Sequence, residues 1–301
     1  MIAVPLLAAA LLCASVAPPV DSRVLEAAGI VRVCTDADLA GREALPTPGT
    51  APRAGLASPT RAPWIVANGW RFVRQPGGKY IYDVPPGKAA LAAAEAFAYG
   101  ANAALKIDAA DVQPLGEMLR FLQALPPVNR SRPSVDLPTV ADFGIVDDGS
   151  AMTGEVMNLL ARRNLLFEIV RERTPRFKIN IRIGSPEYPR EEAADPSAFA
   201  LKIRRQLTDE QRALRVFGSE VVICRLTGDM GSARVHLINY GGREIQGLRI
   251  RVRGVYSAGE AHVAGAGRLD LEDRSTDGSS TEFTIPRLTT YAVVDLARVR
   301  L

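Results

Sequence analysis

The hydrophobic periodicity of this 301-residue chain changes once, near Glu220, and that change constrains the fold more than any other feature. Before Glu220, apolar residues recur with helical spacing between short β-branched runs. After it, apolar and polar residues alternate in short runs that end at turns such as Gly241-Gly242 and Asp277-Gly278. The first pattern predicts helices that alternate with parallel strands, and the second predicts an antiparallel sandwich. The expected fold class is therefore α/β followed by all-β.

A proline-rich stretch divides the α/β part into two units. Residues 126–139 read PPVNRSRPSVDLPT, which is typical of a linker between domains. In the first unit, residues 21–126, we expect helices at 22–28, 88–99 and 112–124, strands at 30–35, 64–67 and 103–107, and loops at 44–63 and 71–86. In the second unit, residues 139–219, we expect strands at 143–146, 165–170 and 177–183, and helices at 153–163, 196–207 and 208–215. Residues 220–301 complete the chain as the β-sandwich.

The chain begins with an apolar run, residues 2–17, that is short for a membrane span of about 20 residues. Its length and the small-x-small sequence Ser15-Val16-Ala17 are typical of a secretory signal. We therefore expect residues 1–20 to be a signal peptide, the protein to be secreted or periplasmic, and no stable membrane span. A buried first helix and a misassigned start codon are the alternatives. Cleavage would leave Cys34 and Cys224, whose spacing does not require a disulfide.

Composition argues against several classes of protein. The net charge of +4, from 37 Lys and Arg against 33 Asp and Glu, is spread along the chain, so nucleic acid is not an expected partner. Three Cys and two His are few for a disulfide framework or a zinc site, and we expect no metal and no cofactor. The chain also lacks the G-x-S-x-G, Walker A, H-E-x-x-H and G-x-G-x-x-G motifs, which counts against an α/β hydrolase or transferase.

Three stretches resemble parts of one family of enzymes. They are Ala92–Leu105 (AAAEAFAYGANAAL), Arg234–Val252 (RVHLINYGGREIQGLRIRV) and Phe283–Leu296 (FTIPRLTTYAVVDL). Their residue patterns and their order along the chain resemble the C-terminal half of the barrel glycoside hydrolases of the family 42 β-galactosidase type. The resemblance implies a partial barrel-like α/β unit, a flavodoxin-like unit similar to an amidotransferase or trimerisation domain, and a terminal β-sandwich. It also implies carbohydrate as the ligand and is compatible with a homo-oligomer.

The family's pair of catalytic carboxylates is not evident in this sequence. A retaining glycosidase needs two carboxylates on different barrel strands, and in this family both are Glu. The strand that ends at Ala67 is followed by Asn68-Gly69-Trp70, without a Glu. The chain is therefore a non-catalytic relative, a fragment of a longer gene, or an enzyme with a different site, and whether it is an enzyme stays open.

Three acids follow strands of the first unit and are the candidate catalytic residues. Asp36 and Asp38 come after the strand expected at 30–35, and Asp108 comes after the strand expected at 103–107. The carboxyl ends of parallel strands are where α/β proteins place their sites, so these acids would serve a hydrolase or transferase. Ordinary loop acids or helix caps are the alternative.

A dense group of aromatic and polar residues is the candidate sugar-binding site. Its members are Trp64, Asn68, Trp70, Arg71, Arg74, Tyr80 and Tyr82. Aromatic faces stack on sugar rings, while amide and guanidinium groups hydrogen-bond to hydroxyls. Ordinary loop packing is the alternative, because large aromatic side chains usually pack.

Three smaller features have simpler interpretations. Asp147-Asp148-Gly149-Ser150 is expected to cap the helix that follows, with a ligand site as the alternative. His236 is expected to be a structural or surface residue, since the only other histidine is His262 and no third metal ligand is evident. The arginines at 249, 251 and 253 are expected to form the solvated face of a strand.

The sequence thus predicts a secreted protein related to glycoside hydrolases that acts on or binds carbohydrate. One alternative is a non-catalytic sugar-binding or assembly module that kept the accessory domains. The other is an α/β hydrolase or transferase that uses the acids at the strand ends.

Overall fold

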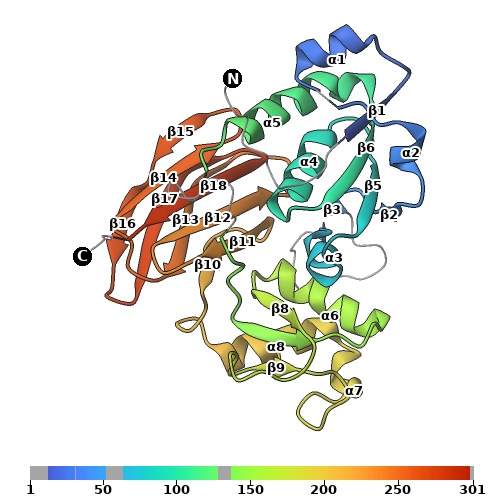
Figure 1. The fold of residues 1–301 in the computed structure, drawn as a ribbon. Helices are drawn as coiled ribbons and strands as arrows, with labels where there is room; N and C mark the ends of the chain where they lie inside the picture. Colours follow the sequence, from blue (N-terminus) through green and yellow to red (C-terminus); the bar gives the residue numbers. More distant parts are fainter. Residues whose placement is uncertain (1–12, 31, 52–63, 128–136, 299–301) are drawn as a thin grey trace.

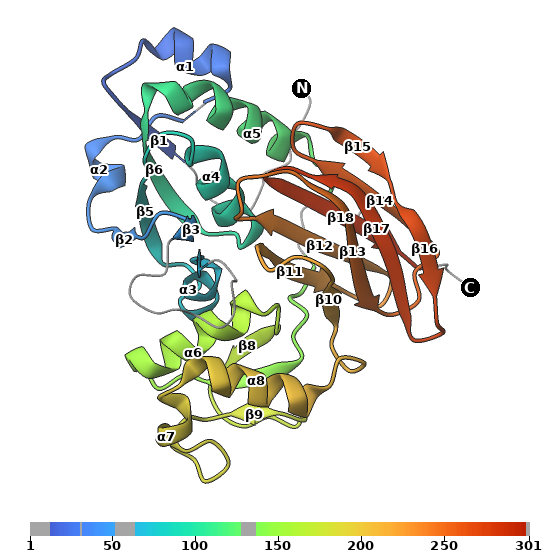
Figure 2. The same cartoon turned by 180° about the vertical axis from the view of Figure 1, so that it is seen from behind.

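The computed structural model describes residues 13–30, 32–51, 64–127 and 137–298. Three units follow one another along this part of the chain (Figure 1). The first unit, blue to green, lies beside the orange and red sandwich, and the yellow-green second unit lies below both; Figure 2 shows the same arrangement from behind. The fold class expected from the sequence, α/β followed by all-β, is confirmed.

A four-stranded parallel sheet in the order β1-β6-β5-β2 forms the centre of the first unit. Its strands are β1 (Cys13–Ala17), β2 (Glu43–Leu45), β5 (Lys79–Asp83) and β6 (Asn102–Asp108). The helices are α1 (Ser22–Ala28), α2 (Asp36–Leu39), α3 (Gly69–Arg74), α4 (Ala89–Ala98) and α5 (Val112–Ala124), with a 3-10 turn at Ala109–Asp111. A separate antiparallel ribbon consists of β3 (Gly49–Ala51) and β4 (Trp64–Val66).

Small side chains allow the helices of this unit to pack closely. Helix α4 reads AALAAAEAFA, and most of its residues are buried, as expected for a helix that is apolar on all sides. Gly116 in α5 lies against α1, where a Cβ atom would come within 1.7 Å of the carbonyl oxygen of Ala28. Only glycine fits at this crossing, so the lack of a side chain at Gly116 allows α1 and α5 to pack closely.

Three expectations for the first unit are wrong. The loop expected at 44–63 contains most of β2 and all of β3. Residues 32–35 form no strand; they carry only an isolated bridge between Ala14 and Val33, and β1 occupies the place in the sheet. Residues 71–86, expected to be a loop, contain most of α3 and the central strand β5. The cause is that the glycines and prolines flanking β5 resemble turn signals, although Tyr80 and Tyr82 alternate with polar neighbours as strand residues do.

The N-terminal segment and the cysteines are arranged differently from the expectation as well. Residues 1–12 of the expected signal peptide lie outside the described residues, whereas residues 13–17 form β1. Cys13 forms a disulfide with Cys34, and Cys224 is buried and free. A bond between Cys34 and Cys224 is therefore ruled out in this structure.

The second unit is a three-stranded parallel sheet, ordered β8-β7-β9, covered by helices. Its elements are β7 (Phe143–Val146), α6 (Ala151–Arg162), β8 (Phe167–Val170), β9 (Asn180–Ile181), α7 (Arg190–Ala193) and α8 (Pro196–Leu207). The helix expected at 208–215 is absent, because Thr208 has a φ of +56° and ends α8. The segment continues instead into strand β10 (Leu214–Val216) of the sandwich.

Two antiparallel sheets form the sandwich, in the orders β10-β13-β17-β16 and β11-β12-β18-β14-β15. The remaining strands are β11 (Val222–Gly228), β12 (Ser232–Asn239), β13 (Ile245–Arg253), β14 (Ala258–Val263), β15 (Gly267–Asp270), β16 (Glu272–Thr276), β17 (Ser280–Leu288) and β18 (Tyr291–Ala297). The stripe at 249, 251 and 253 lies on β13, where Arg249 pairs with Glu282 and Arg251 hydrogen-bonds to Ser280 at 2.8 Å. Arg253 hydrogen-bonds to the carbonyl oxygen of Gln211 at 2.7 Å. Arg249 and Arg253 are exposed, as expected for a solvated face, whereas Arg251 is largely buried.

The larger sheet of the sandwich packs its outer face on the first unit. The ring of Tyr291 in β18 packs in T-shaped contacts against Phe97 of α4 and Phe121 of α5, with ring centroids 6.3 and 6.2 Å apart. His236 of β12 is buried there and hydrogen-bonds to the Tyr291 hydroxyl at 2.6 Å, so its expected structural role is confirmed. Within the described residues, no helix is both long and apolar enough to cross a membrane.

Candidate functional site

Two of the three acids predicted as catalytic, Asp38 and Asp108, cap local backbone. Asp36 and Asp38 lie in the first turn of α2, where Thr35 and Asp38 form a capping box. The hydrogen bonds from the backbone and side chain of Thr35 lower the pKa of Asp38. Asp108 accepts a hydrogen bond of 2.8 Å from the backbone nitrogen of Ala110. Among the described residues, no hydrogen bond or ion pair joins these three acids to one another.

A fully buried carboxylate, Glu95 of α4, gathers two of the predicted sugar-binding residues. The Tyr82 hydroxyl donates to Oε2 at 2.6 Å, and the Tyr240 hydroxyl donates to Oε1 at 2.7 Å. Asn68 donates its backbone N–H to Oε1 at 2.5 Å and its Nδ2 to Oε2 at 3.2 Å. All four residues are completely or almost completely buried, so the network joins α4, β5 and the sandwich in a dry interior.

Burial decides the electrostatics of this network. It raises the pKa of Glu95, although the hydrogen bonds from Tyr82, Tyr240 and Asn68 act in the opposite direction. Burial also raises the pKa of Tyr82 and of Tyr240, and the nearby Glu95 adds to the effect. No second carboxylate takes part in the network as far as the chain is described, and donors occupy both oxygens of Glu95. The arrangement therefore suits a structural role between two units.

Trp70 and Arg74 join α3 to the second unit. Trp70 is 8% exposed and belongs to the core of the second unit, where its ring lies against Gly154 of α6. Arg74 forms two parallel hydrogen bonds with Asp147, at 2.9 and 2.8 Å, and a third with the carbonyl oxygen of Ser150 at 2.9 Å. Ser150 caps α6 as expected, so the loop before α6 serves helix capping and unit docking.

The other predicted sugar-binding residues lie apart from the Glu95 network. Arg71 contacts two of the predicted residues, since its carbonyl oxygen lies 3.4 Å from the Tyr80 hydroxyl and its guanidinium lies 4.4 Å from the centre of the Trp70 ring. The Tyr80 hydroxyl is directed at the carbonyl oxygen of Gln75 at 3.1 Å inside the first unit. Arg71 pairs with Glu43 at 3.6 Å near the surface. Trp64 in β4 is half-buried, and the guanidinium of Arg162 lies 3.7 Å from the centre of its ring. The structure thus distributes the predicted group over the Glu95 network, the α3–α6 contact and the side of β4.

A pocket of about 930 Å³ lies where β4, the second unit and the sandwich meet. Its walls come from β4, α6 and its C-terminal residues, α8, and residues 215–221 and 245 of the sandwich. Arg162, which covers Trp64, is one of its lining residues. The volume is near the upper end of the range for ligand sites, about 300–1,000 Å³. The sequence did not indicate this pocket, because its walls come from five separate segments of the chain.

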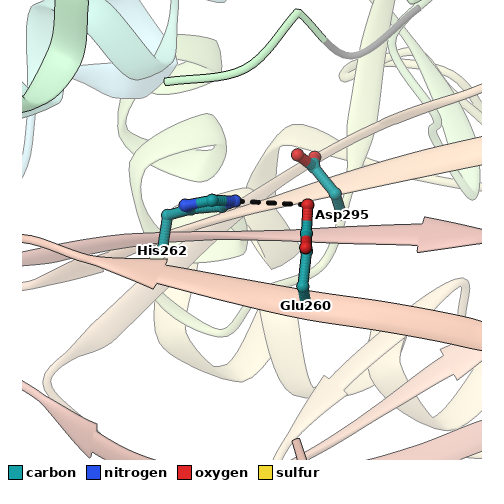
Figure 3. A group of neighbouring side chains, drawn as sticks. All are labelled: Glu260, His262 and Asp295. Carbon is teal, nitrogen blue, oxygen red and sulfur yellow. Dashed lines mark hydrogen bonds and ion pairs between the residues drawn. The ribbon is translucent and has the colours of Figure 1, made fainter. Parts of the chain in front are cut away.

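A second cluster gathers Glu260, His262 and Asp295 on neighbouring strands of the sandwich (Figure 3). The ligand-type atoms of all three lie within 4.8 Å of one another, and His262 Nε2 is 3.4 Å from Glu260. Arg234 holds Asp295 with two hydrogen bonds of 2.6 and 2.7 Å, and Arg268 pairs with Glu260 at 3.1 Å. Because arginines already compensate both carboxylates, we interpret the cluster as a cross-strand ion-pair network.

Comparisons with known proteins bear on the fold. No protein-family model matches the sequence, and no curated protein matches it. The α-L-fucosidase isoenzyme 2 from Paenibacillus thiaminolyticus matches with a TM-score of 0.55 and 9% identity, over 74% of this chain and 61% of that chain. The chain has a glycoside-hydrolase-like fold.

Two structures of a GH42 beta-galactosidase from G. stearothermophilus also match this glycoside-hydrolase-like fold, each at 9% identity. Their TM-scores are 0.45 and 0.41, and the matches cover 77% and 96% of this chain. The chain spans about three fifths of the length of the fucosidase and of these two structures. The fold similarity rests on the fucosidase match, and it agrees with the resemblance to barrel glycoside hydrolases expected from the sequence.

Proposed function

We propose that the protein is an exported carbohydrate-binding relative of the glycoside hydrolases, which does not cleave glycosides by the retaining two-carboxylate mechanism. The observation that carries the proposal is the fold shared with an α-L-fucosidase over 74% of the chain. The pocket of about 930 Å³ at the junction of the three units is large enough to bind an oligosaccharide.

The lining of the pocket supports sugar binding. Apolar side chains such as Ile65, Leu159 and Ile245 share its walls with arginines and with the hydroxyl groups of Ser197 and Ser219. Sugar rings combine apolar faces with hydroxyl groups, so a mixed lining of this kind is complementary to them.

The described carboxylates support the absence of retaining catalysis. A retaining pair needs two carboxyl groups about 5–5.5 Å apart that flank a substrate. Asp38 and Asp108 are engaged in backbone caps, and Glu95 is enclosed by the hydroxyl groups of Tyr82 and Tyr240. None of these acids lines the pocket.

The disulfide between Cys13 and Cys34 supports export, because disulfides persist in oxidising compartments. N-terminal sequencing of the protein from its native host tests this part of the proposal. A protein outside the cytoplasm whose N-terminus lies before Cys13 is expected, because cleavage after Ala17 would remove Cys13 and strand β1 and with them the disulfide. An intact Met1 on cytoplasmic protein would contradict export.

A pocket-filling variant tests carbohydrate binding. Isothermal titration calorimetry of the full chain with a panel of neutral and acidic oligosaccharides should give at least one binder. Ser219→Trp, which fills the pocket without changing its charge, should abolish that binding. Ser275→Trp on the exposed strand β16 is the matched control and should bind as the wild type does. Equal binding by both variants would place the sugar elsewhere and overturn the proposal.

A further inference from the structure

Arginine dominates the polar part of the pocket at the junction of the units. Five arginines line it: Arg162, Arg163, Arg204, Arg212 and Arg215. Glu220 is the one acidic residue among the lining residues given for this pocket in the described chain. Guanidinium groups stay charged in proteins, so the walls carry a clear excess of positive charge.

Three of these arginines share one carboxylate outside the lining. Asp209 accepts hydrogen bonds from Arg204 at 3.2 and 3.4 Å and from Arg212 at 3.2 Å, and it pairs with Arg215 at 3.2 Å. Burial raises the pKa of Asp209, but the bonds and charges of these arginines outweigh it and lower the pKa overall. A single negative charge cannot neutralise three guanidinium groups, so donor capacity and charge remain for a ligand.

Two of these arginines have unused hydrogen-bonding capacity. Arg163 hydrogen-bonds to the Ser197 hydroxyl at 2.9 Å and forms no ion pair in the described part of the chain. Asp195 and Glu220 are nevertheless near enough to act on its charge. Arg212 is 5% exposed, and its Nε has no acceptor among the described residues, although its other nitrogens are bonded. A buried donor without an acceptor costs free energy, which an anionic ligand or a water molecule in the pocket would recover.

The walls around the arginines are apolar and flat in part. The Phe217 ring lies 4.5 Å from the guanidinium of Arg215 and 5.6 Å from that of Arg249. Ile65 of β4 in the first unit and Leu159 of α6 in the second unit add aliphatic surface to the walls. The pocket thus combines an apolar surface for a ring with guanidinium groups, which bind planar carboxylates and tetrahedral oxyanions in pairs of hydrogen bonds.

We infer that this pocket selects an oligosaccharide that carries carboxylate or sulfate groups, with Arg163 and its neighbours holding the anionic substituents. The inference rests on the proposed function, because it names the class of sugar that the same pocket takes. Uronic acids and sulfate esters present the same chemistry to a guanidinium group, namely a negatively charged oxygen cluster on a sugar ring.

The test compares charged and neutral ligands on the full chain by isothermal titration calorimetry. The probes are trigalacturonic acid, a chondroitin sulfate tetrasaccharide and the neutral maltotriose, and inorganic sulfate serves as a competitor. At least one acidic probe is expected to bind, maltotriose is not, and affinity should fall as salt rises. Binding of trigalacturonic acid alone would identify carboxylate as the recognised group, and binding of the chondroitin sulfate tetrasaccharide alone would point to sulfate.

Two variants connect the selectivity to the pocket. Arg163→Gln removes a guanidinium that forms no ion pair in the described chain, and it should weaken binding of the acidic probe by about 10- to 100-fold. Arg173→Gln changes an arginine of the same unit that is 64% exposed and paired with Glu187, and it should leave binding unchanged. Thermal melting of both variants should match the wild type.

The outcomes separate the inference from the function on which it rests. Equal binding of maltotriose and the acidic probes, with no effect of Arg163→Gln, would overturn the inference and leave carbohydrate binding in place. Binding of sulfate alone, without any oligosaccharide, would overturn the sugar class and the proposed function together. If Arg173→Gln weakens binding of the acidic probe as much as Arg163→Gln does, the assignment to this pocket is overturned.

Discussion

The hydroxyl of Tyr240, just beyond β12 of the sandwich, donates a hydrogen bond of 2.7 Å to Oε1 of Glu95 in helix α4 of the first unit. Both side chains are fully buried. A polar contact in such an interior is strong when made and costly when broken. The contact therefore helps to fix the position of the sandwich relative to the first unit.

Removal of this contact should destabilise the protein without harming its packing. Tyr240→Phe keeps the ring but deprives Glu95 of one donor, so the free energy of unfolding should fall by about 1–3 kcal/mol. Urea denaturation at constant pH measures the change. Tyr256→Phe is the matched control, since the Tyr256 side chain is buried but its hydroxyl makes no hydrogen bond to any described residue. Equal losses in both variants would refute the importance of the Glu95 contact.

Asp142 should give stability a pH dependence of defined sign. Burial raises the pKa of Asp142 from 3.8 to about 6, and the bond from the backbone nitrogen of Ala213 offsets only part of that effect. Between these two values the unfolded chain loses its proton while the folded protein keeps it. Stability should therefore fall as pH rises from about 4 to 6, by at most about 3 kcal/mol.

Asp142→Asn tests this cause, because it retains an acceptor for Ala213 and removes the titration. The variant should lose the fall in stability between pH 4 and 6 and exceed the wild type at pH 7. Denaturant titrations at several pH values measure both effects. A variant with an unchanged pH profile would show that Asp142 is not the responsible group.

Trp70 should behave as a core residue. Its ring lies in the core of the second unit and is 8% exposed, so Trp70→Ala should cost about 3–5 kcal/mol of stability. Chemical denaturation monitored by circular dichroism measures the loss, and Trp70→Phe should recover part of it. If Trp70→Ala melts within a few degrees of the wild type and loses a fluorescence response to oligosaccharides, Trp70 is a sugar platform after all.

The chain should not turn over simple glycosides by a retaining mechanism. The described acids at strand ends are engaged in caps, as Asp38 and Asp108 show. A screen of nitrophenyl glycosides should give rates no higher than those of buffer. Robust turnover that disappears in Asp36→Ala or Asp108→Ala would contradict this and favour a hydrolase or transferase at the strand ends.

Local patterns were sufficient to predict many elements of the fold. Helices α1, α5 and α8 begin and end where the sequence indicates, because helix propensity and amphipathic spacing agree in each, and aspartates cap α1 and α8. Strand β5 was missed because Gly78 and Pro85 bracket it like a loop. Strand β1 was missed because its residues continue an apolar run that reads as a signal. Local reasoning cannot choose between two segments that compete for one place in a sheet.

The junctions between units were not accessible to the same reasoning. Glu95 sits in an alanine-rich helix, where a single glutamate looks like an ordinary helix former, and its partner Tyr240 is 145 positions away. The arginines of the pocket lie on three separate segments, at 162–163, 204 and 212–215, and each alone resembles a surface residue. Only the packing of three units brings them together, because no local periodicity records such contacts.

The most direct test of carbohydrate binding is a crystal structure of the full chain grown with the acidic oligosaccharide that binds best in solution. Our account predicts the sugar in the pocket between β4, α6 and the sandwich, with an anionic group within hydrogen-bond distance of Arg163. A sugar bound at another surface, with the pocket holding only water, would contradict it.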